Sequence, residues 1–180
     1  MVKLTLLLKA TLDNVTSLEP ASDQHEFYLK VQCSSCHEVH PNHVPVNMQE
    51  EHELSSGRGT ASFVWKCSFC KREASLSFLP PQPPSQGVYA PKNKKNIKIP
   101  FSNKPLPIVE SDTWTVFLTV ECRGLEAVGF DWEGTWRCGV PDRETTFEDV
   151  VFEDGRWDEY DEESAAPCSI EELESQWVKV

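Results

Sequence analysis

The sequence lacks the features of a membrane or nucleic-acid-binding protein. No apolar stretch approaches the roughly 20 residues of a membrane helix, and the apolar start is interrupted by Thr5 and closed by Lys9, too early for a signal peptide. Positive charge is scarce: 17 Lys and Arg stand against 29 Asp and Glu, a formal net charge of −12. Nucleic-acid backbones repel such a chain. We therefore predict a soluble cytoplasmic protein, with the nucleus as a second location, no membrane contact and no nucleic-acid partner.

Helical periodicity is also missing, since no segment keeps a 3.6-residue apolar period over three turns. Short runs of β-branched, aromatic and aliphatic residues are present instead. Leu4, Leu6 and Leu8 alternate with other residues, and Thr113–Glu121 is the strongest strand pattern of the chain. Further strand-like runs lie at 27–31, 61–66, 74–79 and 177–180. We predict a mainly β fold.

Composition divides the chain into three segments. Residues 80–107 are rich in proline and then in lysine and asparagine, so we interpret them as a loop or insertion, solvated or in contact with an acidic partner. Residues 1–79 form a first β subdomain and 108–180 a second one with an acidic surface. Within the second, 144–174 is strongly acidic but carries large apolar residues, which distinguishes it from a disordered tail.

The two subdomains share a pattern. Leu6–Leu18 can be aligned with Val116–Val128: in both, an apolar strand ends in a turn and apolar residues then recur three positions apart. A duplicated β unit would explain this, although chance similarity between two such segments remains the alternative. Duplication predicts two similar β-sandwich-like subdomains with approximate internal symmetry.

Four of the seven cysteines form two CxxC pairs, Cys33 with Cys36 and Cys67 with Cys70. Each pair follows a strand-like run, as in zinc knuckles, and four thiolates suit a tetrahedral zinc ion, although iron would fit the same ligands. We predict one zinc ion per chain, in the first subdomain. Because four protein ligands leave no position for water or substrate, the site is expected to be structural. A thioredoxin-like use of CxxC would need a helix after one pair, and no helical pattern follows either.

Other metal-binding or reactive groups are weaker candidates. Five histidines could replace a cysteine or form a second weak site, but no HxxxH helix accompanies them, so we interpret them as loop residues; they are His25, His37, His40, His43 and His52. Cys122, Cys138 and Cys168 remain. Arg123 could lower the pKa of Cys122, but cysteines at strand ends are more often small buried apolar residues. We predict no catalytic residue.

These motifs together resemble the eukaryotic CXXC-motif-containing zinc-binding protein family. The resemblance covers nearly the whole chain and, besides the two CxxC pairs, rests on segments at 8–16, 28–30, 57–62, 121–126 and 157–161. It implies a mostly β protein of two similar subdomains, with one zinc ion held by the four cysteines of the first. It also implies no established enzymatic activity. The chain departs from the family at 80–107 and at Ala127, where proline is usual.

We therefore expect a non-enzymatic, monomeric protein in which structural zinc stabilises a β fold that binds a protein partner. Two alternatives stay open. The histidines and spare cysteines would suit a metal-handling protein, either zinc-responsive or the partner of a metallochaperone. An enzyme resembling the zinc-containing methionine sulfoxide reductases would use Cys122, Cys138 or Cys168 as its nucleophile. The sequence does not identify the partner.

Overall fold

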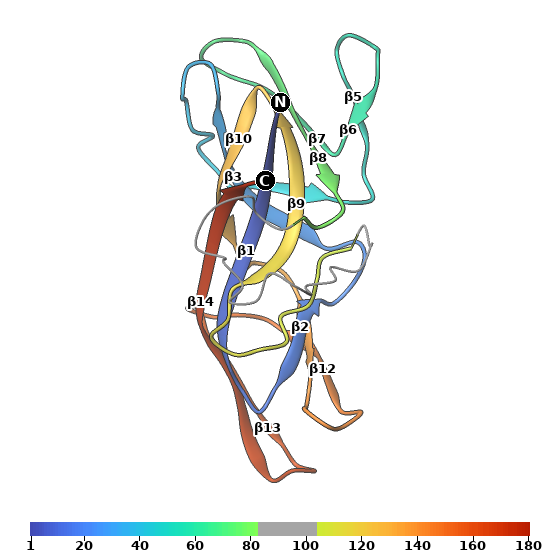
Figure 1. Cartoon of the computed structure of the whole chain (residues 1–180), viewed down its shortest axis with the longest axis vertical. Helices are drawn as coiled ribbons and strands as arrows, with labels where there is room; N and C mark the ends of the chain where they lie inside the picture. The colour runs from blue at the N-terminus through green and yellow to red at the C-terminus, as the bar shows by residue number, and fades with distance from the viewer. Residues whose placement is uncertain (83–103) are drawn as a thin grey trace.

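The computed structural model describes residues 1–82 and 104–180, and the regular structure of this part of the chain is entirely β (Figure 1). The first half contributes β1 (Val2–Asp13), β2 (Thr16–Pro20), β3 (Glu26–Cys33), β4 (Val44–Asn47), β5 (His52–Glu53), β6 (Thr60–Ala61), β7 (Phe63–Lys66) and β8 (Glu73–Leu79). The second half contributes β9 (Thr115–Arg123), β10 (Leu125–Asp131), β11 (Trp136–Gly139), β12 (Thr146–Val150), β13 (Trp157–Asp161) and β14 (Ala166–Lys179). The prediction of a mainly β fold is confirmed.

Three sheets carry most of the structure. A six-stranded antiparallel sheet has the order β13-β14-β1-β9-β8-β7, and two three-stranded sheets have the orders β10-β3-β4 and β12-β11-β2. β5 and β6 form a separate hairpin. In Figure 1, β1, β9 and β14 run along the long axis, while β7, β8 and β10 lie towards one end and β12 and β13 lie at the other.

The strand orders show the predicted internal symmetry. We match β1–β4 with β9–β12, and the hairpin β7–β8 with β13–β14. When each strand is replaced by its match, the six-stranded sheet keeps the same strand order, counted from its opposite edge. The sheet β10-β3-β4 then maps onto β2-β11-β12, so each three-stranded sheet takes one strand from the other half of the chain. Strands from 1–79 and 108–180 thus pair within all three larger sheets; the division into two subdomains at these boundaries stays a prediction.

The turns after β1 and β9 agree with this matching. In the alignment of Leu6–Leu18 with Val116–Val128, Asn14 corresponds to Gly124. Both residues adopt a left-handed backbone conformation, with φ of 56° and 74° respectively. Asparagine and glycine are the residues that tolerate this conformation best. The alignment therefore marks two equivalent turns, one in each repeat.

The first strand is more deeply buried than its alternating pattern indicates. Besides Leu4, Leu6 and Leu8, the intervening Thr5 and Leu7 are also fully buried, because β1 lies at the centre of its sheet with both faces covered. On one face the Thr5 hydroxyl is hydrogen-bonded to that of Thr119 on β9 (2.9 Å) and donates to the backbone carbonyl of Gln82 (2.7 Å). A central strand with two covered faces needs apolar residues at nearly every position.

An aromatic cluster fills the core between the central sheet and β11. Trp136 has no exposed surface, and its ring packs against Trp132, Phe117 and Phe152 at centroid distances of 5.3, 5.7 and 6.2 Å. Its indole N–H donates to the Trp132 carbonyl (3.0 Å), so the polar atom of this buried ring is satisfied.

The acidic segment 144–174 is folded, as its apolar residues predict. Its residues form most of β12–β14, and Phe147 packs against Trp157 at 5.3 Å between ring centroids. Of its aromatic side chains, Tyr160 is largely exposed. The prediction for 80–107 falls mostly outside the described residues, including four of its five lysines. No helix among the described residues is long and apolar enough to cross a membrane.

Candidate metal centre

The two CxxC pairs lie on neighbouring turns at one end of the molecule. Cys33 ends β3 and Cys36 follows it, while Cys67 and Cys70 lie in the turn between β7 and β8. In both turns the first cysteine donates its backbone N–H to the carbonyl five residues later, at 2.8 Å in the first turn and 3.0 Å in the second. The residue after the second cysteine is left-handed in both cases; these residues are His37 and Lys71.

The four sulfur atoms converge on one point. The Cys33 and Cys70 sulfurs are 3.6 Å apart, those of Cys36 and Cys67 are 3.5 Å apart, and all four lie within 4.8 Å of one another. Sulfurs arranged tetrahedrally at about 2.3 Å around zinc would be about 3.8 Å apart. The set therefore fits a zinc ion bound by four thiolates, without any rearrangement of the chain. This is the one such cluster among the described residues.

Backbone N–H groups favour the thiolate form of Cys33, which is the form that binds a metal ion. Hydrogen bonds from the N–H groups of Cys36 and Ser35 lower the pKa of Cys33 to about 6, although burial opposes them. For Cys36, the N–H of Glu38 lowers the pKa, but burial and the neighbouring thiols outweigh it and raise the value to about 12. Four sulfurs packed this closely cannot all be ionised next to one another unless a cation lies between them.

Two contacts hold the turns in position. The Arg72 guanidinium donates to the Ser35 hydroxyl (3.0 Å), which joins the second turn to the first. The backbone N–H of Ser34 donates to the carbonyl of Gly124, in the turn between β9 and β10 (3.0 Å). Residues 121–126, one of the segments on which the family resemblance rests, thus hold the first CxxC turn in place through this hydrogen bond.

Gly124 should not tolerate a side chain. Its φ is +74°, and a Cβ atom there would lie 3.2 Å from the Glu73 carbonyl and 3.3 Å from the Cβ of Ala74. We expect Gly124→Ala to reduce the free energy of unfolding by about 1–3 kcal/mol, measured by chemical denaturation of the zinc-loaded protein. Gly57→Ala is a suitable reference, because Gly57 also has positive φ but open space around it. Equal losses of unfolding free energy in the two variants would show that the close contact of residue 124 with β8 does not contribute to the loss.

The other predicted candidates lie elsewhere. His37 and His43 are exposed residues outside the strands, in agreement with their interpretation as loop residues; His40 is partly buried, His52 is exposed but lies on β5, and His25 is buried. Cys122, Cys138 and Cys168 are all buried, as expected for small apolar residues.

None of these three thiols is activated. Burial raises the pKa of Cys122 to about 12, so the lowering by Arg123 that the sequence allowed is wrong. Burial, together with Cys168, raises the pKa of Cys138 to about 12, and burial also raises that of Cys168. A thiol held neutral and inaccessible is a poor nucleophile.

The equivalent turns of the second repeat, residues 140–145 and 162–165, contain no cysteine or histidine. After β11, the Val140 N–H donates to the Thr145 carbonyl (3.0 Å), which reproduces the five-residue turn that begins at Cys33. The Glu163 carboxylate of the β13–β14 turn accepts from the Thr145 hydroxyl (2.8 Å) and lies 3.8 Å from the Arg143 guanidinium. An ion pair and a hydrogen bond thus join the two turns that correspond to those joined by zinc in the first repeat. No sequence motif marks this network.

Comparison with known proteins agrees with the site. The chain matches the model of the family described as CXXC motif containing zinc binding protein, eukaryotic, over residues 5–178. The CXXC motif containing zinc binding proteins of Homo sapiens and Mus musculus are 31% and 34% identical to it, each alignment covering 99% of both chains.

Solved structures share the fold. The crystal structure of C1orf123 superimposes with a TM-score of 0.80 at 29% identity, covering 99% of each chain. A hypothetical protein from Plasmodium falciparum superimposes with a TM-score of 0.74 at 22% identity, over 98% of this chain and 99% of that one. The second likeness concerns the fold alone.

Proposed function

This chain belongs to the eukaryotic family of CXXC motif containing zinc binding proteins, and on that basis we propose that it is a non-enzymatic protein-interaction module. In this proposal one structural zinc ion per chain is held by Cys33, Cys36, Cys67 and Cys70. The protein is a monomer that works in the cytoplasm, with the nucleus as a second location, where reducing conditions keep the thiolates available for metal.

The observation that carries the proposal is the closed set of four sulfurs. All four ligand positions of a tetrahedral ion are taken by protein, so neither water nor substrate can reach the metal by simple binding. The burial of Cys122, Cys138 and Cys168 supports the absence of a thiol-dependent reaction, since no sulfoxide substrate could reach their sulfurs.

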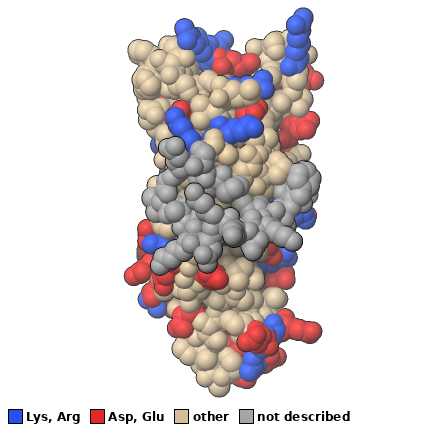
Figure 2. Space-filling model, viewed as in Figure 1, with Lys and Arg blue, Asp and Glu red and all other residues tan. Residues whose placement is uncertain are grey.

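The metal end offers a surface for a partner. Phe69, inside the second CxxC pair, is 73% exposed, which is unusual for a large apolar side chain. Lys66, Lys71 and Arg72 lie exposed beside it, and Figure 2 shows Lys and Arg side chains projecting at this end of the molecule. We propose that Phe69 inserts into an apolar pocket of a protein partner whose rim is acidic, on a turn that zinc keeps rigid.

This surface is tested by replacing Phe69. A central aromatic anchor contributes about 2 kcal/mol or more to binding, so Phe69→Ala should weaken the partner complex about 30-fold or more. Tyr160→Ala is the matched control, because Tyr160 is 53% exposed but lies on β13. Proteins that copurify with the tagged chain from its own cells are compared quantitatively. Proteins retained by the wild type and by Tyr160→Ala but lost with Phe69→Ala support the proposal; identical sets with all three chains contradict it.

Metal handling is the second candidate, and one observation favours it. Cys36 and Cys70 are only partly buried, so a thiol-bearing partner could approach their sulfurs. A protein that transfers its ion must release it readily, whereas a structural site retains it. Competition with a chromophoric chelator separates the two: slow exchange of a single ion supports a structural role, and rapid exchange supports metal handling.

A further inference from the structure

A pocket that contains none of the four clustered cysteines lies where the two repeats meet. Its volume is about 360 Å³, and it is lined by residues of β2, β3 and β11, by the end of β4 and by Lys104. Strands from both halves of the chain thus form its walls. Small-molecule sites occur preferentially at such junctions, and this volume is near the lower end of their usual range of about 300–1,000 Å³.

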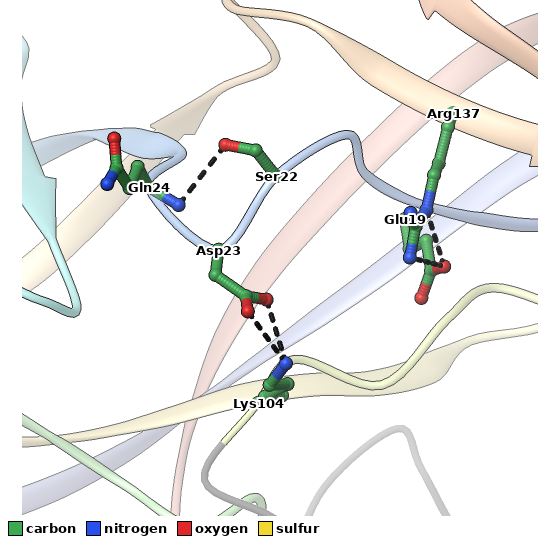
Figure 3. A network of polar contacts seen from close by, with 6 residues as sticks. All are labelled: Glu19, Ser22, Asp23, Gln24, Lys104 and Arg137. Carbon is green, nitrogen blue, oxygen red and sulfur yellow. Dashed lines mark hydrogen bonds and ion pairs between the residues drawn. The ribbon is translucent and has the colours of Figure 1, made fainter.

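Among the described residues, charges of both signs surround the pocket in equal number. Arg137 on β11 pairs with Glu19 on β2 (2.7 Å), and Lys104 pairs with Asp23 (2.9 Å) (Figure 3). Two cations and two carboxylates give the lining no net charge. A multiply charged ligand such as a nucleotide would therefore find no electrostatic advantage here, whereas a zwitterion could match both signs at once.

A buried imidazole ring contributes to the pocket wall. His25 is only 9% exposed, and its ring is held by Phe27 and Trp136 at centroid distances of 5.0 and 5.1 Å. Burial lowers its pKa, although a hydrogen bond to the Thr135 backbone opposes this, so the ring is neutral near pH 7.

The Nε2 atom of this ring is the unpaired one: it has no hydrogen-bond partner among the described residues. The atom is itself buried, so a ligand that does not displace the ring cannot reach it, and His25 contributes its ring to the pocket wall but no hydrogen bond.

The remaining lining is apolar. Pro20, Phe27, Met48 and Pro105 contribute to the walls, and methionine adapts to side chains of different shapes. The pocket thus combines an apolar wall, a buried imidazole ring and paired charges of both signs.

We propose that this pocket binds a free α-amino acid with an apolar side chain. The ammonium group donates to the carboxylates of Asp23 and Glu19. The carboxylate accepts from Arg137 and Lys104, and the side chain packs against Phe27 and Met48. This inference does not depend on the proposed function, because the pocket contains none of the zinc ligands and not Phe69.

The experiment uses full-length, zinc-loaded protein with ¹⁵N-labelled histidine, titrated with L-leucine and L-methionine. We expect saturable shifts of the His25 imidazole resonances below about 10 mM amino acid. N-acetyl-L-leucine, which lacks the ammonium group, and L-leucinamide, which lacks the carboxylate, should each bind at least about tenfold more weakly. The absence of a saturable shift, or equal binding of the blocked compounds, would overturn the proposal.

Two variants locate the binding. Arg137→Gln and Lys104→Gln each remove one half-exposed or exposed cation and should weaken leucine binding about tenfold while the amide spectrum stays that of the folded protein. Arg143→Gln is the control, because Arg143 pairs with Glu163 in the β13–β14 turn, outside the pocket; it should bind leucine like the wild type. Unchanged affinity in both Arg137→Gln and Lys104→Gln would overturn the assignment to this pocket.

Discussion

Replacing Cys67 with alanine is expected to abolish zinc binding and to unfold the metal end of the molecule. Structural zinc sites contribute about 10–16 kcal/mol in small peptides near neutral pH. That is as large as the whole stability of a typical domain, about 5–15 kcal/mol. The packing of β3 and β7 against their neighbours cannot compensate for such a loss. Hydrogen exchange should therefore show loss of amide protection in β3, β4, β7 and β10, with protection retained in β1, β9 and β14.

The control for this variant is Cys168→Ala. Cys168 is buried like Cys67, but its sulfur contacts Asn14 in the turn after β1 and is not one of the four clustered thiols. Cys168→Ala should leave the zinc content unchanged and lower the free energy of unfolding only by the small amount expected for a shortened buried side chain. A Cys67→Ala protein with wild-type protection throughout and no metal would contradict a structural role for the site.

Replacing Trp136 with alanine is expected to produce the second-largest loss. The side chain is fully buried and joins β11 to Phe117 of β9 and to Phe130 of β10. Truncating a core tryptophan typically costs about 3–5 kcal/mol through lost burial and the cavity left behind. Both repeats contribute rings to this cluster, so the loss should lower the midpoint of a single transition for the whole chain. The midpoint is measured by denaturant unfolding of the zinc-loaded protein.

Tyr160→Ala provides the comparison, since an exposed side chain usually changes stability by no more than about 0.5 kcal/mol. If Trp136→Ala unfolds in two separate transitions and only the transition of β11–β13 is shifted, the two repeats fold independently. That outcome would contradict the exchange of strands between the two halves as a source of cooperativity.

The metal site was predictable from the sequence because its information is local. A CxxC turn specifies its own geometry within a few residues, and two such turns at strand ends leave few alternatives for four thiolates. The strand at Thr113–Glu121 was recognisable for a similar reason, since β-branched and aromatic residues favour strands without long-range help.

The exchange of strands was not predictable, because it depends on partners far apart in sequence. β10 pairs with β3, and Leu125 lies opposite Cys33. The sequence of each strand alone shows only a short apolar run. Strand pairing is decided by packing of both faces, which no local pattern encodes. His25 shows the same effect at one residue: its neighbours suggest a polar loop, but Phe27 and Trp136 enclose its ring.

The most direct test of the central claim is the zinc content of the natively purified protein, measured by native mass spectrometry. The arrangement of Cys33, Cys36, Cys67 and Cys70 predicts one zinc ion per folded chain, and no metal on chains in the charge states of unfolded protein. Two results would contradict this prediction: compactly folded chains without metal, and folded chains that carry iron instead of zinc or a second metal ion besides it.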